Sequence, residues 1–260
     1  MKQKYQNKKI DFVVTCFLLL ITALIHYFLN LPAIVGWFFY LGIPSSYLMW
    51  REKKNYKKIA FALLLFGVIF AFIFDFIVTL NEGWVVTRLA VPFRLFGFYP
   101  FFDDILGFVL MTLFIVVFYE HFFDDEKNKR ISNRFIQGLI PSLVVLTLVL
   151  AVYWINSEVL KLSYVYTVSG VAAIILPLYV GFKRPQMLNK LLGVSFFFFF
   201  VWLVAELVAV ATNGWIFPGE YIGWVELFGL GFPFEELFFW MLFYAATIVS
   251  YYELLIDDYR

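Results

Sequence analysis

Six carboxylic acids stand out because they lie within or directly beside long apolar stretches of the sequence. Two of them have mainly Phe, Ala, Leu and Val neighbours, and the other four form two adjacent pairs at the starts of apolar stretches. A carboxylate in hydrocarbon is costly unless it is paired, hydrated or protonated, so such residues mark functional sites. Protonated acids beside ionised ones, in an aromatic apolar environment, are what general acid–base chemistry requires. The predicted catalytic residues are Glu235, Glu236, Glu206, Asp75, Asp103 and Asp104.

Two opposing effects act on these carboxyl groups. Pro100 and Pro233 predict helix starts, because proline is favoured in the first turn. An acid in a first turn faces the positive end of the helix dipole, which stabilises its charge by roughly 0.3–1 kcal/mol. Desolvation is larger wherever the group is dry, so we expect Asp75 and Glu206, which lack the first-turn effect, to be the protonated pair.

The same residues also have a purely structural interpretation. Glu235 and Glu236 would then cap a helix at the membrane interface, and Asp75 would only satisfy a neighbouring backbone group or hydroxyl.

The composition determines the class of protein that must position these acids. Of 260 residues, 63% are hydrophobic and 15% are charged, and the mean hydropathy is +0.85. These values exclude a soluble globular enzyme and a disordered chain. A net charge of +1 without a long basic block argues against a nucleic-acid partner. The single cysteine, Cys16, excludes a disulfide framework and a cysteine metal site, and no glycine-rich fingerprint predicts a nucleotide or flavin cofactor.

Continuous apolar runs predict an all-α integral membrane protein with eight transmembrane helices. About 20 helical residues cross the hydrocarbon core, and helices satisfy their own backbone groups there. The expected spans are residues 10–30, 32–50, 58–80, 101–123, 134–155, 162–182, 190–212 and 233–255.

The distribution of positive charge predicts the orientation of these spans. Seventeen of the 20 Lys and Arg residues fall in the two tails and in the loops after spans two, four and six. Only Arg88, Arg94 and Lys161 fall on the other side. By the positive-inside rule both termini are cytoplasmic, in a multi-pass protein of the cell membrane.

The sequence also contains an internal repeat, with residues 1–130 as a first four-helix unit and 131–260 as a second. Pro100 and Pro233 lie 133 positions apart, as do three further matched pairs. Asp75 lies nine residues before a tryptophan, and Glu206 lies nine residues before Trp215. Four spans in each unit give parallel repeats, which predict a site where the two halves meet. The three further pairs are Tyr119 with Tyr252, Glu120 with Glu253, and Asp124 with Asp257.

The segment 231–239 (GFPFEELFF), preceded by Asn213-Gly214-Trp215, resembles the lycopene cyclase domain, a membrane-embedded, non-flavin family found as two small subunits or as a tandem fusion. That family carries a P-x-E-E-x-x-F-F signature. Here the Phe pair falls one position earlier, and the first half has two aspartates, Asp103 and Asp104, that are shifted by one position relative to Glu235 and Glu236.

The resemblance implies cofactor-independent cyclisation of the ends of a linear carotenoid, such as lycopene or a related polyene. An acid would protonate a terminal double bond, a six-membered ring would close, and a carboxylate would remove a proton. Glu235 and Glu236 would be the acid–base pair. Expected partners are this polyene, membrane lipid and other enzymes of carotenoid synthesis. The substrate-binding residues would be Pro233, Phe238, Phe239, Trp240 and Trp215.

Two other functions remain compatible with the residues. A proton-coupled transporter of a small lipid or metabolite would also use parallel repeats and intramembrane carboxyls. A non-catalytic carotenoid-binding protein would keep the fold without the chemistry.

Overall fold

The computed structural model describes residues 2–51, 55–94, 102–124 and 130–257, with residues 2–6 described by their backbone only. Within these residues, eight helices are long and apolar enough to cross a membrane, so the prediction of a helical, multi-pass membrane protein is confirmed. The spans are Asn7–Leu29, Ala33–Arg51, Tyr56–Leu80, Phe102–Asp124, Phe135–Leu160, Val165–Lys183, Pro185–Ala211 and Glu236–Leu255.

The expected bounds agree with these spans to within a few residues. The largest differences, five residues each, are at the end of the fifth span, Leu160, and at the start of the seventh, which begins at Pro185 because proline is tolerated in the first helical turn. Pro233 was expected in the first turn of the last helix, but it is the last residue of a strand. The predicted helix start at Pro100 lies outside the described residues.

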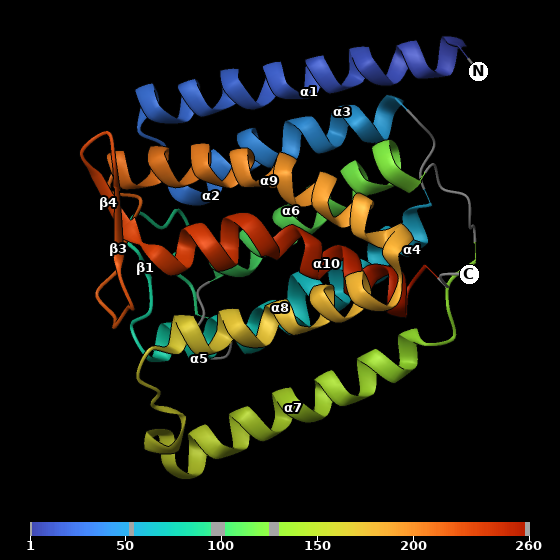
Figure 1. The fold of residues 1–260 in the computed structure, drawn as a ribbon. Coiled ribbons are helices and arrows are strands. Elements are labelled where there is room, and N and C mark those ends of the chain that lie inside the picture. Colours follow the sequence, from blue (N-terminus) through green and yellow to red (C-terminus); the bar gives the residue numbers. More distant parts are fainter. Residues whose placement is uncertain (1, 52–54, 95–101, 125–129, 258–260) are drawn as a thin grey trace.

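The described chain is mainly helical, with four short strands; the α and β labels are those of Figure 1, and η marks π-helical or 3-10 segments. The helical segments are α1 (Lys2–Leu29), α2 (Ala33–Trp37), η1 (Phe38–Gly42), α3 (Ile43–Arg51), α4 (Tyr56–Ala62), η2 (Leu63–Phe70), α5 (Ala71–Leu80), α6 (Phe102–Tyr119), η4 (Glu120–Asp124), α7 (Phe135–Asn156), η5 (Ser157–Leu160), α8 (Val165–Lys183), α9 (Pro185–Ala211), η6 (Glu236–Met241) and α10 (Leu242–Leu255). The strands are β1 (Val85–Val86), β2 (Trp215–Ile216), β3 (Trp224–Leu227) and β4 (Leu230–Pro233).

The helices lie side by side, with both chain ends at one end of the bundle and the strands at the other (Figure 1). We call these the terminal end and the strand end. Helices α1 and α7 lie along opposite edges, and α6 lies in the middle. In the span containing α6, 78% of the apolar window is buried, against 22% for α1 and 17% for the span containing α7. The central helices therefore position buried groups, while α1 and α7 have mainly exposed apolar surfaces.

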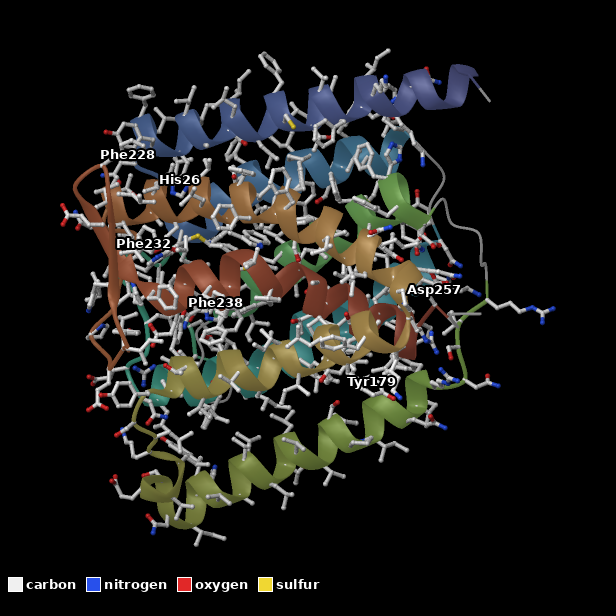
Figure 2. The ribbon with its side chains drawn as sticks, in the orientation of Figure 1. His26, Tyr179, Phe228, Phe232, Phe238 and Asp257 are labelled. Carbon is white, nitrogen blue, oxygen red and sulfur yellow. The ribbon has the colours of Figure 1, made fainter. Side chains whose placement is uncertain are left out.

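Two antiparallel strand pairs close the strand end. Strand β1 follows α5 and pairs with β2, which follows α9, so Val86 lies opposite Trp215. Strands β3 and β4 form a hairpin whose tip is Phe228-Gly229, both at positive φ, as a two-residue primed turn requires. Phe228 is exposed at this tip (Figure 2). The hairpin leads directly into the last span and thereby fixes where its first acids lie.

Four of the described spans contain a π-helical segment: η1, η2, η4 and η6. Such segments widen the helical turn and often occur at functional sites. Segment η6 begins at Glu236 and is continuous with α10. The wider turn favours placing residues four apart, such as Glu236, Trp240 and Tyr244, on the same face.

Candidate functional site

A small cavity of about 60 Å³ lies between the central spans toward the strand end, and we call it the acid chamber. It is lined almost entirely by aromatic side chains and by two glutamates. The lining residues are Trp37, Phe74, Trp84, Phe108, Met111, Tyr166, Trp202, Ala205, Glu206, Trp215, Glu236, Trp240 and Tyr244.

Glu206, near the end of α9, is one of the two acids of the chamber and is buried. Its Oε1 accepts a hydrogen bond of 3.0 Å from the indole Nε1 of Trp215. The pairing of β1 with β2 holds the Trp215 backbone, and the ring stacks on Trp37 with an interplanar angle of 11°. The carboxyl group is thus oriented by an indole that is itself fixed on two sides.

Glu236, the first residue of η6, is the second acid. The Tyr166 hydroxyl donates a hydrogen bond of 2.6 Å to its Oε1, and both side chains are buried. Glu206 and Glu236 are close enough to interact electrostatically. Two neighbouring carboxyls in an aromatic cavity are the arrangement that acid–base chemistry requires.

Glu235 does not line the chamber, although it precedes Glu236 in the sequence. It is fully buried, and its Oε1 accepts hydrogen bonds from the Thr167 hydroxyl (2.6 Å) and the Ile222 backbone N–H (2.8 Å). These contacts fasten the loop before β3 to α8. The chamber therefore pairs Glu236 with Glu206, and Glu235 supports the loop beside it.

Asp75 repeats the contact of Glu206 in the first half of the chain. Its Oδ1 accepts a hydrogen bond of 2.7 Å from Nε1 of Trp84, nine residues later in the sequence. Trp84 lines the chamber and lies 6.1 Å from the Trp215 ring, whereas Asp75 is buried outside the lining. Asp75 thus positions an aromatic wall residue.

Asp103 and Asp104 lie in the first turn of α6, one position later in the repeat than Glu235 and Glu236. The carboxylate of Asp103 accepts hydrogen bonds from the backbone N–H groups of Ala90 (2.7 Å) and Val91. Asp104 is buried and interacts electrostatically with Asp75. Neither aspartate lines the chamber, so its walls come from both halves of the chain and its acids come from residues 131–260.

The five predicted substrate-binding residues separate into two groups. Trp240 and Trp215 line the chamber. Phe239 packs against Gly170, where an added Cβ would lie 2.3 Å from its ring. Phe238 (labelled in Figure 2) is 39% exposed and stacks on Phe234, and Pro233 ends strand β4; neither is among the residues that line the chamber.

Several lining residues were not predicted as functional. Trp202 lies one helical turn before Glu206, and Tyr244 follows Trp240 by four residues, so a search for aromatics at helical spacing from the acids would have found both. Phe74, Trp37 and Tyr166 carry no such signal, because they reach the chamber from distant elements. Trp84 was recognised through its spacing from Asp75, to which its indole donates a hydrogen bond.

A second buried polar group lies at the terminal end, and we call it the terminal cluster (Asp257 is labelled in Figure 2). Tyr119 donates a hydrogen bond to Glu253 and Tyr252 donates one to Glu120, so matched residues exchange partners across the halves. Three carboxylates of this cluster each contribute one oxygen atom, and these three oxygens lie within 4.8 Å of one another. Such an arrangement could hold a cation. The three are Glu120, Asp124 and Asp257.

Two lysines supply positive charge to the terminal cluster. Lys58 pairs with Asp257, and Lys190 pairs with Asp124 at 2.8 Å. Burial raises the pKa of Asp257 to about 6, although the ammonium group of Lys58 acts in the opposite direction. The cluster ties the two halves together far from the acid chamber.

Comparison with known proteins adds no identification, because no family model, no curated protein and no solved structure matches this chain.

Proposed function

We propose that this chain is a membrane enzyme that cyclises the ends of a linear carotenoid by acid–base catalysis, without a cofactor. The observation that carries the proposal is the presence of Glu206 and Glu236 in one buried aromatic chamber. The resemblance of residues 231–239 to the lycopene cyclase domain supplies the substrate class.

The reaction begins when the protonated member of the Glu206–Glu236 pair transfers its proton to the terminal carbon–carbon double bond of the polyene. The π electrons of a second double bond attack the resulting cation, which closes a six-membered ring. The ionised member of the pair then removes a ring proton and forms the ring double bond. Substrate and product are isomers, so the step needs no oxidant or reductant.

The pair also resets itself. After one turnover the proton has moved from one glutamate to the other. Because both carboxyls share the chamber, one proton transfer between them restores the starting state. Tyr166 and Trp215 hold the two groups in place during this exchange.

The aromatic walls have two roles in the proposed reaction. An indole or phenol face stabilises a nearby cation by roughly 0.5–2 kcal/mol. Five tryptophans and two tyrosines line the chamber, so several faces surround the positive charge. The small volume also leaves little room for water, which would otherwise trap the cation as an alcohol.

We propose in addition that the chain consists of two parallel four-helix repeats in the cell membrane, with both termini cytoplasmic. The reciprocal Tyr119–Glu253 and Tyr252–Glu120 contacts and the paired indole–carboxyl bonds support the repeat. The distribution of Lys and Arg supports the orientation. A reporter fused to the C-terminus should be active only on the cytoplasmic side, and activity outside the cell would overturn the orientation.

Expression in a lycopene-producing bacterium, followed by pigment extraction, tests the activity. Wild-type protein should convert lycopene to a cyclic product. Glu206→Gln and Glu236→Gln should abolish ring formation, whereas Glu226→Gln, at an exposed carboxyl of the hairpin, should not.

Uncyclised lycopene in cells whose membranes contain folded wild-type protein would refute the cyclase assignment for this substrate. Lycopene that copurifies unchanged with the protein would then support a carotenoid-binding protein. An active Glu236→Gln variant would remove Glu236 from the mechanism.

A further inference from the structure

We propose that an apolar groove beside the acid chamber binds the body of a linear polyene chain and delivers its end to Glu206 and Glu236. The inference rests on the proposed function. We call this cavity of about 450 Å³ the lateral groove. Its lining residues are Phe66, Phe70, Ala71, Ile73, Phe74, Ile77, Phe108, Pro141, Ser142, Val145, Ser169, Ala172, Ala173, Trp240, Tyr244, Thr247, Ile248 and Tyr251.

The groove adjoins the chamber. Phe74, Phe108, Trp240 and Tyr244 line both cavities, so the two cavities have a common wall. The chamber, at about 60 Å³, is far smaller than the roughly 300–1,000 Å³ of a pocket for a complete ligand, whereas the groove lies within that range. A long substrate whose end reacts in the chamber therefore needs the groove for the rest of its chain.

The groove opens on the apolar sides of the spans. On its rim Pro141, Val145 and Ala172 are exposed, and Val145 is 45% exposed. All three lie inside helices long and apolar enough to span a membrane. A hydrocarbon could thus enter sideways from the bilayer without crossing water.

The lining suits a hydrocarbon and no polar headgroup. It contains no Lys, Arg, His, Asp or Glu among the described residues. The Thr247 hydroxyl donates to the Phe243 and Ala173 carbonyls, and that of Ser142 donates to the Gly138 carbonyl, so both are satisfied by helix backbones. Because these two hydroxyl groups already donate to backbone carbonyls, neither is free to donate to a phosphate or a sugar.

The long aromatic lining of the lateral groove favours a straight, rigid chain over a flexible acyl chain. Phe66 and Ile77 lie eleven residues apart along one span, so the lining extends over roughly two to three helical turns. At the Phe66 end of this stretch, Phe66, Phe70 and Tyr251 form an edge-to-face and tilted cluster, with centroids 5.5–6.2 Å apart. Fixed aromatic faces fit the flat face of a conjugated polyene.

A second groove provides a matched control within the same protein. It has about 520 Å³, lies between α1, α6 and α9, and is also apolar and rich in phenylalanine. It shares no lining residue with the acid chamber. Cys16 lines it as an exposed small residue, as Ala172 does in the lateral groove.

The test measures binding separately from turnover. Purified protein in lipid nanodiscs is titrated with lycopene, and binding is followed by quenching of tryptophan fluorescence. Ala172→Phe and Val145→Phe, which fill the lateral groove from two helices, should each weaken binding about tenfold or more. Cys16→Phe should change it less than about twofold. Thermal unfolding of each variant identifies any that fails to fold.

The outcomes separate the groove from the cyclase. If folded Ala172→Phe and Val145→Phe bind and cyclise lycopene as wild type does, the groove assignment is overturned while the proposed function stands. If wild type binds lycopene, the two variants do not, and no ring forms in any protein, the groove stands and the cyclase fails. Equal competition by a saturated hydrocarbon of matched length would overturn the preference for a polyene.

Discussion

Tyr166→Phe is the substitution that tests the mechanism most directly, because it removes one hydroxyl and leaves the chamber wall in place. The phenol is buried and donates a 2.6 Å hydrogen bond to Glu236. A hydrogen bond to a charged group contributes about 1.5–3 kcal/mol, and 1.4 kcal/mol is a factor of ten in rate. If the charge on Glu236 changes in the rate-limiting step, cyclisation should slow by roughly 10- to 100-fold.

The assay is single-turnover conversion of lycopene in nanodiscs, with substrate binding measured in parallel. Binding should stay within about twofold of wild type, because the aromatic ring that contacts the substrate is retained. Tyr221→Phe is the matched control: its hydroxyl donates to the Gly83 carbonyl, outside the chamber. It should leave the single-turnover rate unchanged. A Tyr166→Phe rate equal to that of wild type would refute a changing charge on Glu236.

Three further outcomes follow from the contacts described. Glu206→Asp, which withdraws the carboxyl by one methylene, should lower the cyclisation rate at least tenfold while binding persists, as the single-turnover assay would show. Lys58→Met removes a buried partner of Asp257 and should destabilise the protein at pH 7 by roughly 3 kcal/mol, whereas Lys190→Met, whose lysine side chain is 24% exposed, should cost less; thermal unfolding in detergent checks both. Because burial raises the pKa of Asp257 from 3.8 to about 6, the folded state binds this proton more tightly, so the contribution of Asp257 to stability should fall as pH rises from about 4 to 6. If the free energy of unfolding of Asp257→Asn depended on pH between 4 and 6 as steeply as that of wild type, Asp257 would not be the titrating group.

The spans and the unusual acids could be predicted from the sequence, because long apolar runs and buried charges are local signals. The partner of Glu236 could not. Successive residues on a helix point in different directions, so adjacent glutamates do not both face one small cavity. Glu235 turns to Thr167 and Ile222, and Glu206 joins Glu236 from another helix. That pairing depends on how the helices pack.

The pairing of the strands could not be predicted from the local sequence either. Strand β1 has only two residues, and it pairs with β2, about 130 positions later in the chain. This pairing brings the loops after Asp75 and Glu206 together and sets Trp84 against Trp215. The nine-residue spacing in each half suggested that the tryptophans were equivalent. Only the packed structure brings both into one chamber.

Residues 1–130 and 131–260 contain the same carboxyl–indole contact but use different acids. This difference explains why both acids that line the chamber come from residues 131–260. Each half places a carboxyl nine residues before a tryptophan and bonds it to that indole. In the second half the carboxyl belongs to a glutamate that lines the chamber. In the first half it belongs to an aspartate, one methylene shorter, which stays outside the lining and holds Trp84 in the wall. In the proposed mechanism, residues 131–260 would thus supply the proton-transfer groups, and residues 1–130 would supply Trp84 and other parts of the aromatic wall.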